Sequence, residues 1–188
     1  MIILANNPLF NGIAPNVLTE DLREISFHTR FYRKGEILAH QDDVCNRLVI
    51  LIKGSVRGEM IDDSGRLIKV EDIAAPRAIA PLFLFGNENR YPVEVTANEA
   101  TEVIEIPKAS VLKLFRKNEK FLENYMNLSA NYAHTLSDKL FFMSFKTIRQ
   151  KLASYLLRLS NQQQSEHITL NRSQQQLSDY FGVSRPSL

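Results

Sequence analysis

The feature that most constrains this chain is the stretch 118–145, which contains neither glycine nor proline. Its apolar residues recur every three or four positions, which predicts one unbroken helix with an apolar stripe. A helix of about 25 residues is nearly 40 Å long, more than one small domain can cover. We therefore expect part of the stripe to contact the same helix of a second copy; the alternative is a helix packed wholly on its own domain. The residues expected in this dimer interface are Phe121, Tyr125, Leu128, Tyr132 and Leu136.

Upstream of this helix, apolar residues alternate with a period of two and turn residues recur at short intervals. Such a pattern, without intervening helices, predicts antiparallel strands that form a β-barrel or jelly roll. One short helix is expected before the strands, at 11–25, and another after them, at Ser110–Arg116. The segment Asp62–Gly65 is expected to be a hairpin turn in which Gly65 adopts a positive φ. The predicted strands are Phe27–Tyr32, Glu36–Ala39, Leu48–Ile52, Ser55–Ile61, Arg66–Ile73, Val93–Ala97 and Thr101–Ile106.

The last part of the chain returns to helical periodicity, so the fold class is α+β. A helix that begins near Lys146 is expected to end before the polar run Ser160–Ser165. A short extended piece is expected at Ile168–Leu170. These elements lead into the sequence RSQQQLSDYFGVSRPSL, which is the most informative stretch of the chain.

This C-terminal stretch predicts a helix, a tight turn and the start of a second helix. Ser173 can cap a helix that runs to about Tyr180, and Gly182 can adopt the left-handed conformation of a turn. Val183 would fill the space between the helices, and Ser184 would cap the second one. Pro186 is tolerated because it falls in the first turn of that helix. The pattern is typical of a helix-turn-helix, although a plain helical hairpin in a core is the alternative.

The charge distribution agrees with a nucleic-acid partner. From Lys139 to Leu188 the sequence has seven basic and two acidic residues, a net charge of +5, whereas the whole chain carries +2. In a helix-turn-helix the start of the second helix enters the major groove, where Arg185 could donate two hydrogen bonds to guanine. Hydroxyl groups and a further arginine could contact phosphates. The residues expected to bind DNA are Arg172, Ser173, Ser184, Arg185 and Ser187.

Several segments together resemble the Crp/Fnr family of bacterial transcription regulators, over essentially the whole chain. The order and spacing of these segments carry the resemblance more than any one of them alone. The segments similar to the family's sensor barrel are Lys34-Gly35-Glu36, Leu48–Ile52 with Gly54-Ser55-Val56, and Glu102–Ile106. Those similar to its DNA-binding domain are Arg149–Ala153 with Leu156-Leu157, Leu177-Ser178, and Gly182–Arg185.

The resemblance implies a homodimer joined by the long helix, an effector in the barrel and winged helices that bind a two-fold DNA site. The implied domains are a cyclic-nucleotide-binding-like sensor barrel at 1–117, a dimerisation helix at 118–145 and a helix-turn-helix domain at 146–188. RNA polymerase is a further partner that the family suggests. Family members continue through the recognition helix and a wing, so we expect the sequence ending at Leu188 to be incomplete and to bind DNA poorly as it stands.

The effector site departs from the cyclic AMP binders of the family. Those members hold the phosphate with a loop that contains Gly-Glu and with an arginine. Here the corresponding loop, 78–85, has no glutamate, and Pro81 lacks an amide donor. The family arginine falls on Tyr91, and Arg90 could serve only if the loop shifted by one residue; cyclic AMP is therefore not expected to bind. The apolar site that we expect instead consists of Pro81, Leu82, Phe83, Arg90, Tyr91, Leu136 and Ser137.

The alternative function is a haem-dependent regulator that senses a gas or the redox state, because haem iron accepts histidine or methionine ligands. No spacing marks a haem site, and an ordinary surface or packing role is the competing interpretation for each residue. A single cysteine, Cys45, cannot hold an iron–sulfur cluster, and its use as a redox switch has little support. The conceivable axial ligands are His28, His40, His134, Met60 and Met143.

Other functional classes lack their signatures. His28 and His40 form no H-x-H pair of the kind that metal-binding β-barrel enzymes use, and no Gly-rich nucleotide loop or nucleophile elbow occurs. We therefore expect a protein without enzymatic activity. Neither a signal peptide nor a membrane span is apparent, which predicts a cytoplasmic location and no membrane partner. A barrel with a dimer helix that serves only in protein interaction is the second alternative.

Overall fold

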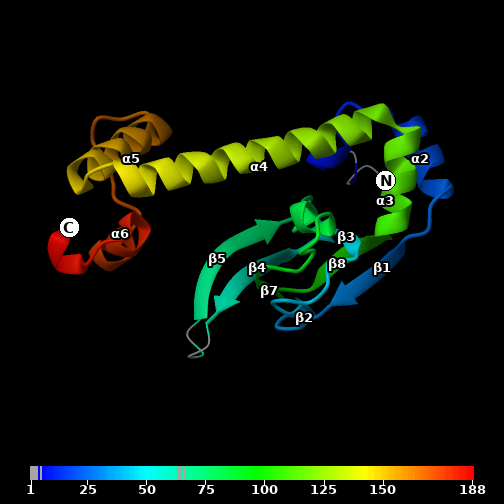
Figure 1. The fold of residues 1–188 in the computed structure, drawn as a ribbon, viewed down its shortest axis with the longest axis horizontal. Helices are drawn as coiled ribbons and strands as arrows, with labels where there is room; N and C mark the ends of the chain where they lie inside the picture. The colour runs from blue at the N-terminus through cyan, green and yellow to red at the C-terminus, as the bar shows by residue number, and fades with distance from the viewer. Residues whose placement is uncertain (1–3, 5, 63–64, 66) are drawn as a thin grey trace. The chain divides into compact units, whose positions relative to one another are not determined.

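The computed structural model describes residues 4, 6–62, 65 and 67–188. The chain divides into two compact units, one that extends to Ser129 and one that runs from Ala130 to Leu188. The boundary falls inside helix α4, which is continuous from Glu119 to Phe145 (Figure 1). The unbroken helix that the sequence predicts is thereby confirmed, and its start differs from the prediction by one residue.

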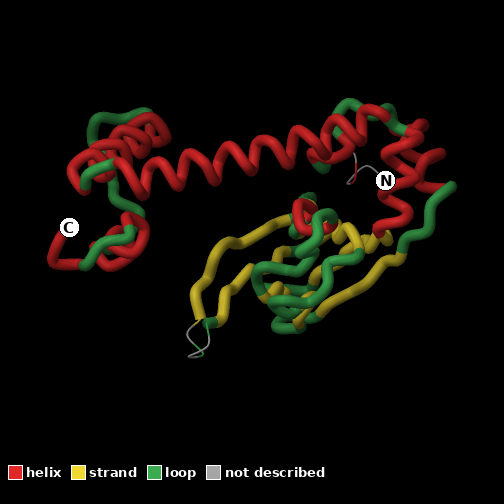
Figure 2. Tube along the Cα trace, in the orientation of Figure 1, coloured by secondary structure: helices red, strands yellow, loops and turns green. Residues whose placement is uncertain are grey.

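The first unit contains two antiparallel sheets in the part of the chain that the structure describes (Figure 2). Every pair of neighbouring strands is antiparallel, which confirms the α+β class and the predicted sheet arrangement. One sheet has the order β1 (His28–Tyr32), β8 (Thr101–Pro107), β3 (Arg47–Lys53), β6 (Ala78–Ile79). The other has the order β2 (Ile37–Ala39), β7 (Glu94–Ala97), β4 (Ser55–Ile61), β5 (Leu67–Ala74).

Strand β3 lies at the centre of its sheet, between β8 and β6, and buries four consecutive side chains, 48–51. A strand covered on both faces needs such an uninterrupted apolar run, so the predicted buried strand is confirmed. The two-residue strand β6 was not predicted, because it is too short to show a period. Of the predicted hairpin turn, Asp63 and Ser64 lie outside the described residues, while Gly65 has the expected positive φ of 78°.

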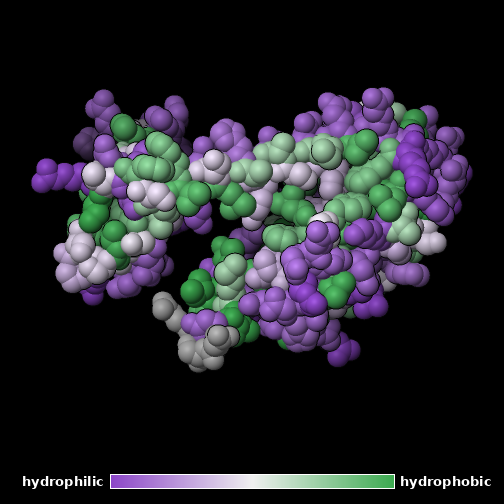
Figure 3. Space-filling model, viewed as in Figure 1, coloured by the Kyte–Doolittle hydropathy of each residue, from purple (hydrophilic) through white to green (hydrophobic). Residues whose placement is uncertain are grey.

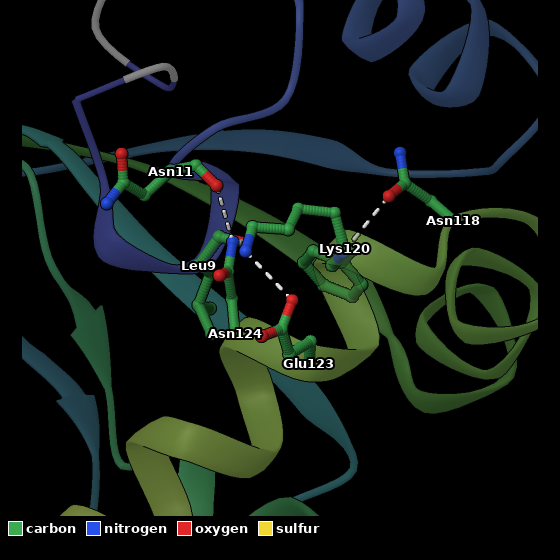
Figure 4. A network of polar contacts seen from close by, with 7 residues as sticks. Leu9, Asn11, Asn118, Lys120, Glu123 and Asn124 are labelled. Carbon is green, nitrogen blue, oxygen red and sulfur yellow. Dashed lines mark hydrogen bonds and ion pairs between the residues drawn. The ribbon is translucent and has the colours of Figure 1, made fainter.

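Helices α2 (Pro15–Arg23) and α3 (Lys108–Lys117) flank the strands in sequence. The helix predicted at 11–25 is shorter than expected because Pro15 lies in its first turn, where proline is favoured. The 3-10 turn η1 (Pro8–Phe10) precedes it and packs on the first turns of α4. There, the Asn124 amide donates to the backbone oxygens of Leu9, at 3.1 Å, and Asn11, at 2.8 Å (Figure 4).

The described residues of the second unit are helices and loops: the end of α4, α5 (Ile148–Gln163), α6 (Gln174–Phe181) and the 3-10 turn η3 (Arg185–Ser187). The buried side chains at its centre are Tyr155, Leu159, Leu177 and Phe181.

One sequence prediction was wrong in the second unit. Helix α5 does not end before Ser160 but continues to Gln163, and its last residues, 161–163, are exposed. The piece Ile168–Leu170, which was expected to be extended, belongs to no helix or strand, and the backbone of Thr169 bonds to a side chain. Gln163 supplies that side chain, accepting from the Thr169 amide at 2.9 Å and donating to its carbonyl at 2.8 Å.

Candidate nucleic-acid interface and effector site

Helix α6 begins and ends as the sequence predicts. Ser173 and Gln176 form a reciprocal capping box, in which each side chain accepts a hydrogen bond from the other residue's backbone amide. At the other end, Gly182 has φ 64° and its amide donates to the carbonyls of Ser178 and Asp179. A residue with a side chain is strained in this left-handed conformation, so the glycine is what lets the chain turn sharply after α6.

The turn leads into η3 in the expected way, with one exception. Val183 is partly buried against the core of the second unit, and its amide donates to Ser178 at 3.0 Å. Ser184 occupies the cap position with an extended backbone, yet its side chain caps no amide. Its hydroxyl bonds instead to the hydroxyl of Ser187, at 2.7 Å. The predicted capping bond of Ser184 is therefore not formed, although the position is right.

All five residues expected to bind DNA are exposed on the second unit. Arg185 donates from Nε to Gln174 at 3.4 Å, and bidentate guanine recognition would use its terminal amino groups. The Arg172 guanidinium lies 4.3 Å from the centre of the Tyr180 ring, a cation–π contact that holds it at the entry to α6. The Ser173 hydroxyl accepts the capping bond described above with one lone pair, and its proton is not used in that bond.

A cavity of about 490 Å³ lies within the second unit, between α4, α5 and α6. Its walls carry two cations, Lys139 and Arg158, and the guanidinium of Arg158 lies 5.8 Å from the centre of the Tyr180 ring. The residues expected in the effector site do not line it. The lining residues are Thr135, Asp138, Lys139, Phe142, Met143, Ser154, Tyr155, Arg158 and Tyr180.

The loop that corresponds to the family's phosphate-binding segment is held by the long helix. Ala80 has a positive φ of 45°, and the 3-10 turn η2 (Pro81–Leu84) follows it. Pro81, Leu82 and Phe83 are half-buried. The hydroxyl of Tyr125, on α4, donates to the carbonyl of Pro81, and burial raises the pKa of this tyrosine. The first part of α4 is thus tied to this loop by the protein's own atoms.

Arg90 and Tyr91 differ in burial. The side chain of Arg90 is exposed, and its guanidinium donates to the carbonyl of Asp42 at 2.6 Å. Tyr91 is only 3% exposed, beside the buried thiol of Cys45. Burial raises the pKa of the Tyr91 hydroxyl and of the Cys45 thiol, so both groups are held in their neutral forms. A neutral, buried thiol is a poor nucleophile, which weighs against Cys45 as a redox switch.

Leu136 and Ser137, the last two residues of the expected effector site, belong to the second unit, and both are exposed there. Two of the side chains considered as haem ligands lie beside carboxylates: His40 is 3.0 Å from Glu94, and His134 is 3.6 Å from Asp138. Among the described residues, no three histidine, cysteine, aspartate or glutamate side chains are grouped so that they could hold a metal ion.

The apolar stripe of α4 has two parts. Phe121 and Tyr125 are 1% and 5% exposed, because they pack inside the first unit. Such side chains have almost no surface left for a partner chain, which corrects the expectation that they form a dimer interface. Leu128 is partly buried against the same core, whereas Tyr132 and Leu136 are 45% and 51% exposed. Figure 3 shows apolar residues at the surface along this helix.

Comparison with known proteins agrees with a chain that has a β-sheet unit followed by a helix-turn-helix. The cyclic nucleotide-binding domain family matches residues 29–118, and the Crp-like helix-turn-helix domain family matches residues 150–188. A transcriptional regulator from Thermotoga maritima of known crystal structure is 32% identical; the alignment covers 69% of this chain and 98% of that one, with a TM-score of 0.63. The chain belongs to the Crp/Fnr family of transcription regulators.

Other Crp/Fnr proteins align over more of the chain. The cyclic AMP receptor protein of Thermus thermophilus is 27% identical over 167 residues, which are 85% of this chain and 72% of that protein. The crystal structure of the Thermus thermophilus catabolite activator protein covers 96% of this chain and 82% of that one at 23% identity, with a TM-score of 0.67. These matches confirm the Crp/Fnr resemblance seen in the sequence. In the described residues no helix is long and apolar enough to cross a membrane.

Proposed function

We propose that this Crp/Fnr regulator works in the cytoplasm as a homodimer that binds a pseudo-palindromic DNA site in response to an effector other than cyclic AMP. The observation that carries the DNA-binding part is the left-handed turn at Gly182, which places Arg185 at the exposed start of the next helical segment. The basic character of the second unit adds the attraction for phosphates on which such binding depends. RNA polymerase is the partner that an activator of this family would recruit.

The dimer part of the proposal depends on the exposed section of α4. Tyr132, Leu136 and Leu140 follow one another at intervals of four residues and expose about half or more of their side chains. Two copies of this section, related by a two-fold axis, would bury the same residues of each chain. A two-fold dimer in turn requires two half-sites on DNA about one helical turn apart, about 34 Å.

The effector part depends on the loop at Pro81. A phosphate at this place would need amide donors and an unpaired cation. Proline has no amide hydrogen, the residue at the family's arginine position is the buried Tyr91, and Arg90 donates to Asp42. Titration calorimetry with cyclic AMP should therefore give no binding at micromolar concentrations. Micromolar binding would contradict the proposal and would mean that Arg90 leaves Asp42 to reach the phosphate. An absorption spectrum of the purified protein tests the haem alternative in the same preparation.

The DNA-binding part is tested by selection from random duplexes with the full-length protein, followed by affinity measurements on the enriched site. An enriched pseudo-palindrome is expected. Replacement of Arg185 by alanine should cost about 1–3 kcal/mol on that site and relax the preference at one base pair of each half-site. Replacement of Arg172 by alanine is the matched control, because it removes the same charge.

The two variants should change DNA binding in different ways. Loss of a phosphate contact at Arg172 weakens binding to all sequences alike and lowers the salt slope by about one. Failure to enrich any palindrome, or an unchanged base preference in the Arg185 variant, would contradict the role given to Arg185. If the protein is a stable dimer in solution and still enriches no palindrome, the result would favour the alternative of a protein that serves only in protein interaction.

A further inference from the structure

A buried lysine connects three helices of the second unit. Lys151 lies in the first turn of α5 and is only 5% exposed. Its ammonium group donates to the carbonyl of Met143 at 3.0 Å and to the carbonyl of Phe181 at 3.0 Å. Met143 belongs to the last turn of α4, and Phe181 is the last residue of α6, directly before the turn at Gly182. One side chain therefore joins the end of the long helix to the helix-turn-helix.

The chemistry of these two acceptors favours a cationic donor. The last carbonyls of a helix have no partner within the helix and carry partial negative charge. Two such ends near each other repel, and a buried ammonium group that donates to both removes the repulsion and satisfies two acceptors at once. Hydrogen bonds from a charged donor are stronger than those between neutral groups. An apolar side chain of the same length would leave both carbonyls without these bonds, and the Phe181 carbonyl lies in a buried position.

Packing around the lysine brings the same two segments together. A Cβ atom added to Gly182 would lie 2.5 Å from Cε of Met143, so the methionine side chain rests directly against the turn. The ring of Phe142, also at the end of α4, lies 6.2 Å from the rings of both Tyr180 and Phe181. The end of α4 thus meets the turn through a bridged pair of carbonyls, a methionine–glycine contact and an aromatic cluster.

We propose that Lys151 is a positioning residue that fixes the recognition turn, Gly182–Arg185, to the end of α4. The inference rests on the proposed DNA-binding role of that turn. Because α4 is one continuous helix, a twist or shift of its last turn moves the Met143 carbonyl, and Lys151 carries that movement to Phe181 and the turn. An effector that acts on α4 therefore reaches the DNA-binding residues through this lysine as well as through apolar packing.

The first test uses the unaltered protein. Ammonium protons of a buried lysine that donates to two carbonyls should exchange slowly enough to give a proton–nitrogen correlation signal by NMR at neutral pH. Lys139, which is exposed on α4, should give no such signal. Assignment of the signal is made by its loss in the variant Lys151→Met. A Lys151 ammonium that exchanges as fast as that of Lys139 would overturn the proposal, whatever the behaviour of any variant.

The second test compares Lys151→Met with Lys139→Met, which removes the same charge from the same unit without touching the carbonyls. Amide hydrogen exchange at Gly182 and Val183 should be about 10- to 100-fold faster in Lys151→Met, the factor expected for loss of charge-assisted hydrogen bonds. The same amides should be unchanged in Lys139→Met. Equal protection of the two amides in both variants would show that the lysine does not fix the turn.

The third measurement is the ratio of affinities for the selected site and for random DNA. Lys151→Met should lower this ratio about 10-fold or more, because a mobile turn presents Arg185 in many orientations. Lys139→Met should weaken both affinities alike and leave the ratio unchanged. If the unaltered protein enriches no DNA site, the proposed function fails, while the ammonium signal and the exchange rates still decide whether Lys151 fixes the turn. An unchanged ratio in Lys151→Met on an enriched site overturns the positioning role alone.

Discussion

The two halves of helix α4 carry the same apolar spacing and have different surroundings. In the first half, Phe121 stacks on Phe10 at 5.2 Å between ring centres and Tyr125 meets Phe115 at 5.0 Å, so both are covered by their own unit. In the second half, Tyr132 and Leu136 are about half exposed. Periodicity shows that a helix has a face to bury. Which segments reach that face decides whether it becomes core or remains available to a second chain.

The largest effect is expected from charges placed on the exposed half. Replacing both Tyr132 and Leu136 with glutamate should separate the proposed dimer, because four carboxylates would be buried without partners in a symmetric interface. The expected loss is at least about 4 kcal/mol, or about a thousandfold in the dimer Kd. Analytical ultracentrifugation over a range of concentrations measures it.

Asn127 offers a control for this pair. It is exposed on the same helix and lies about 180° around the axis from Leu136 and about 140° from Tyr132, off the stripe. Asn127→Glu should leave the dimer intact. An unaltered protein that sediments as a monomer at micromolar concentration would contradict the dimer itself, and equal dissociation of both variants would contradict the choice of face.

On the covered half, Phe121→Ala should act on folding. Removal of a fully buried phenyl ring costs about 3–5 kcal/mol through lost burial and the cavity that it leaves. The loss should appear as a lower urea concentration at the unfolding midpoint of the first unit, measured by the circular dichroism of its sheets. The dimer Kd should stay unchanged under conditions where the variant is folded. A shift in Kd as large as that of the double glutamate variant would remove the distinction between the two halves.

Sequence patterns predicted most of the architecture because the strands and long helices each span more than one period of their repeat. Strand β4 and the end of α4 were placed to the residue, and the turn at Gly182 followed from glycine chemistry. The division of the α4 stripe was not predictable, since it depends on the packing of Phe10, which is distant in sequence.

The candidate sites show the same limit. Arg185 is exposed, as a residue that reads bases would have to be, and Tyr91, which the sequence places at the position of the family's arginine, is buried. The role of Lys151 had no sequence signal, because a lysine in a basic helix is most often a solvated residue. Its burial arises only when the carbonyl ends of α4 and α6 come together.

The variant Gly182→Ala tests the contact between the end of α4 and the turn at Gly182. An alanine at φ 64° is strained by about 1–2 kcal/mol, and its Cβ would also displace the Met143 side chain. Gly35→Ala is the control, because Gly35 has φ 84° and no atom within 4 Å of the added Cβ. The alanine at 182 should therefore destabilise its unit by about 1 kcal/mol more than the alanine at 35 destabilises the first. Equal losses in thermal unfolding would show that Met143 yields without cost.

The smallest effect separates the two tyrosines of the stripe. Tyr125→Phe removes the hydroxyl that donates to the Pro81 carbonyl and should cost about 1 kcal/mol, the usual net value of one such bond. Tyr132→Phe, on the exposed half, should leave the stability of the first unit unchanged.

The contribution of Tyr125 should also depend on pH, because burial raises the pKa of its hydroxyl in the folded chain. The neutral hydroxyl therefore favours folding below the ordinary tyrosine pKa of about 10, and this contribution is lost as the pH rises above that value. The stability difference between the unaltered protein and Tyr125→Phe, measured by urea unfolding, should accordingly be constant from about pH 6 to 9 and decline above about pH 10. A difference that is zero at neutral pH would mean that α4 is joined to the Pro81 loop by ring packing alone, and that the two tyrosines differ only in the area that they bury.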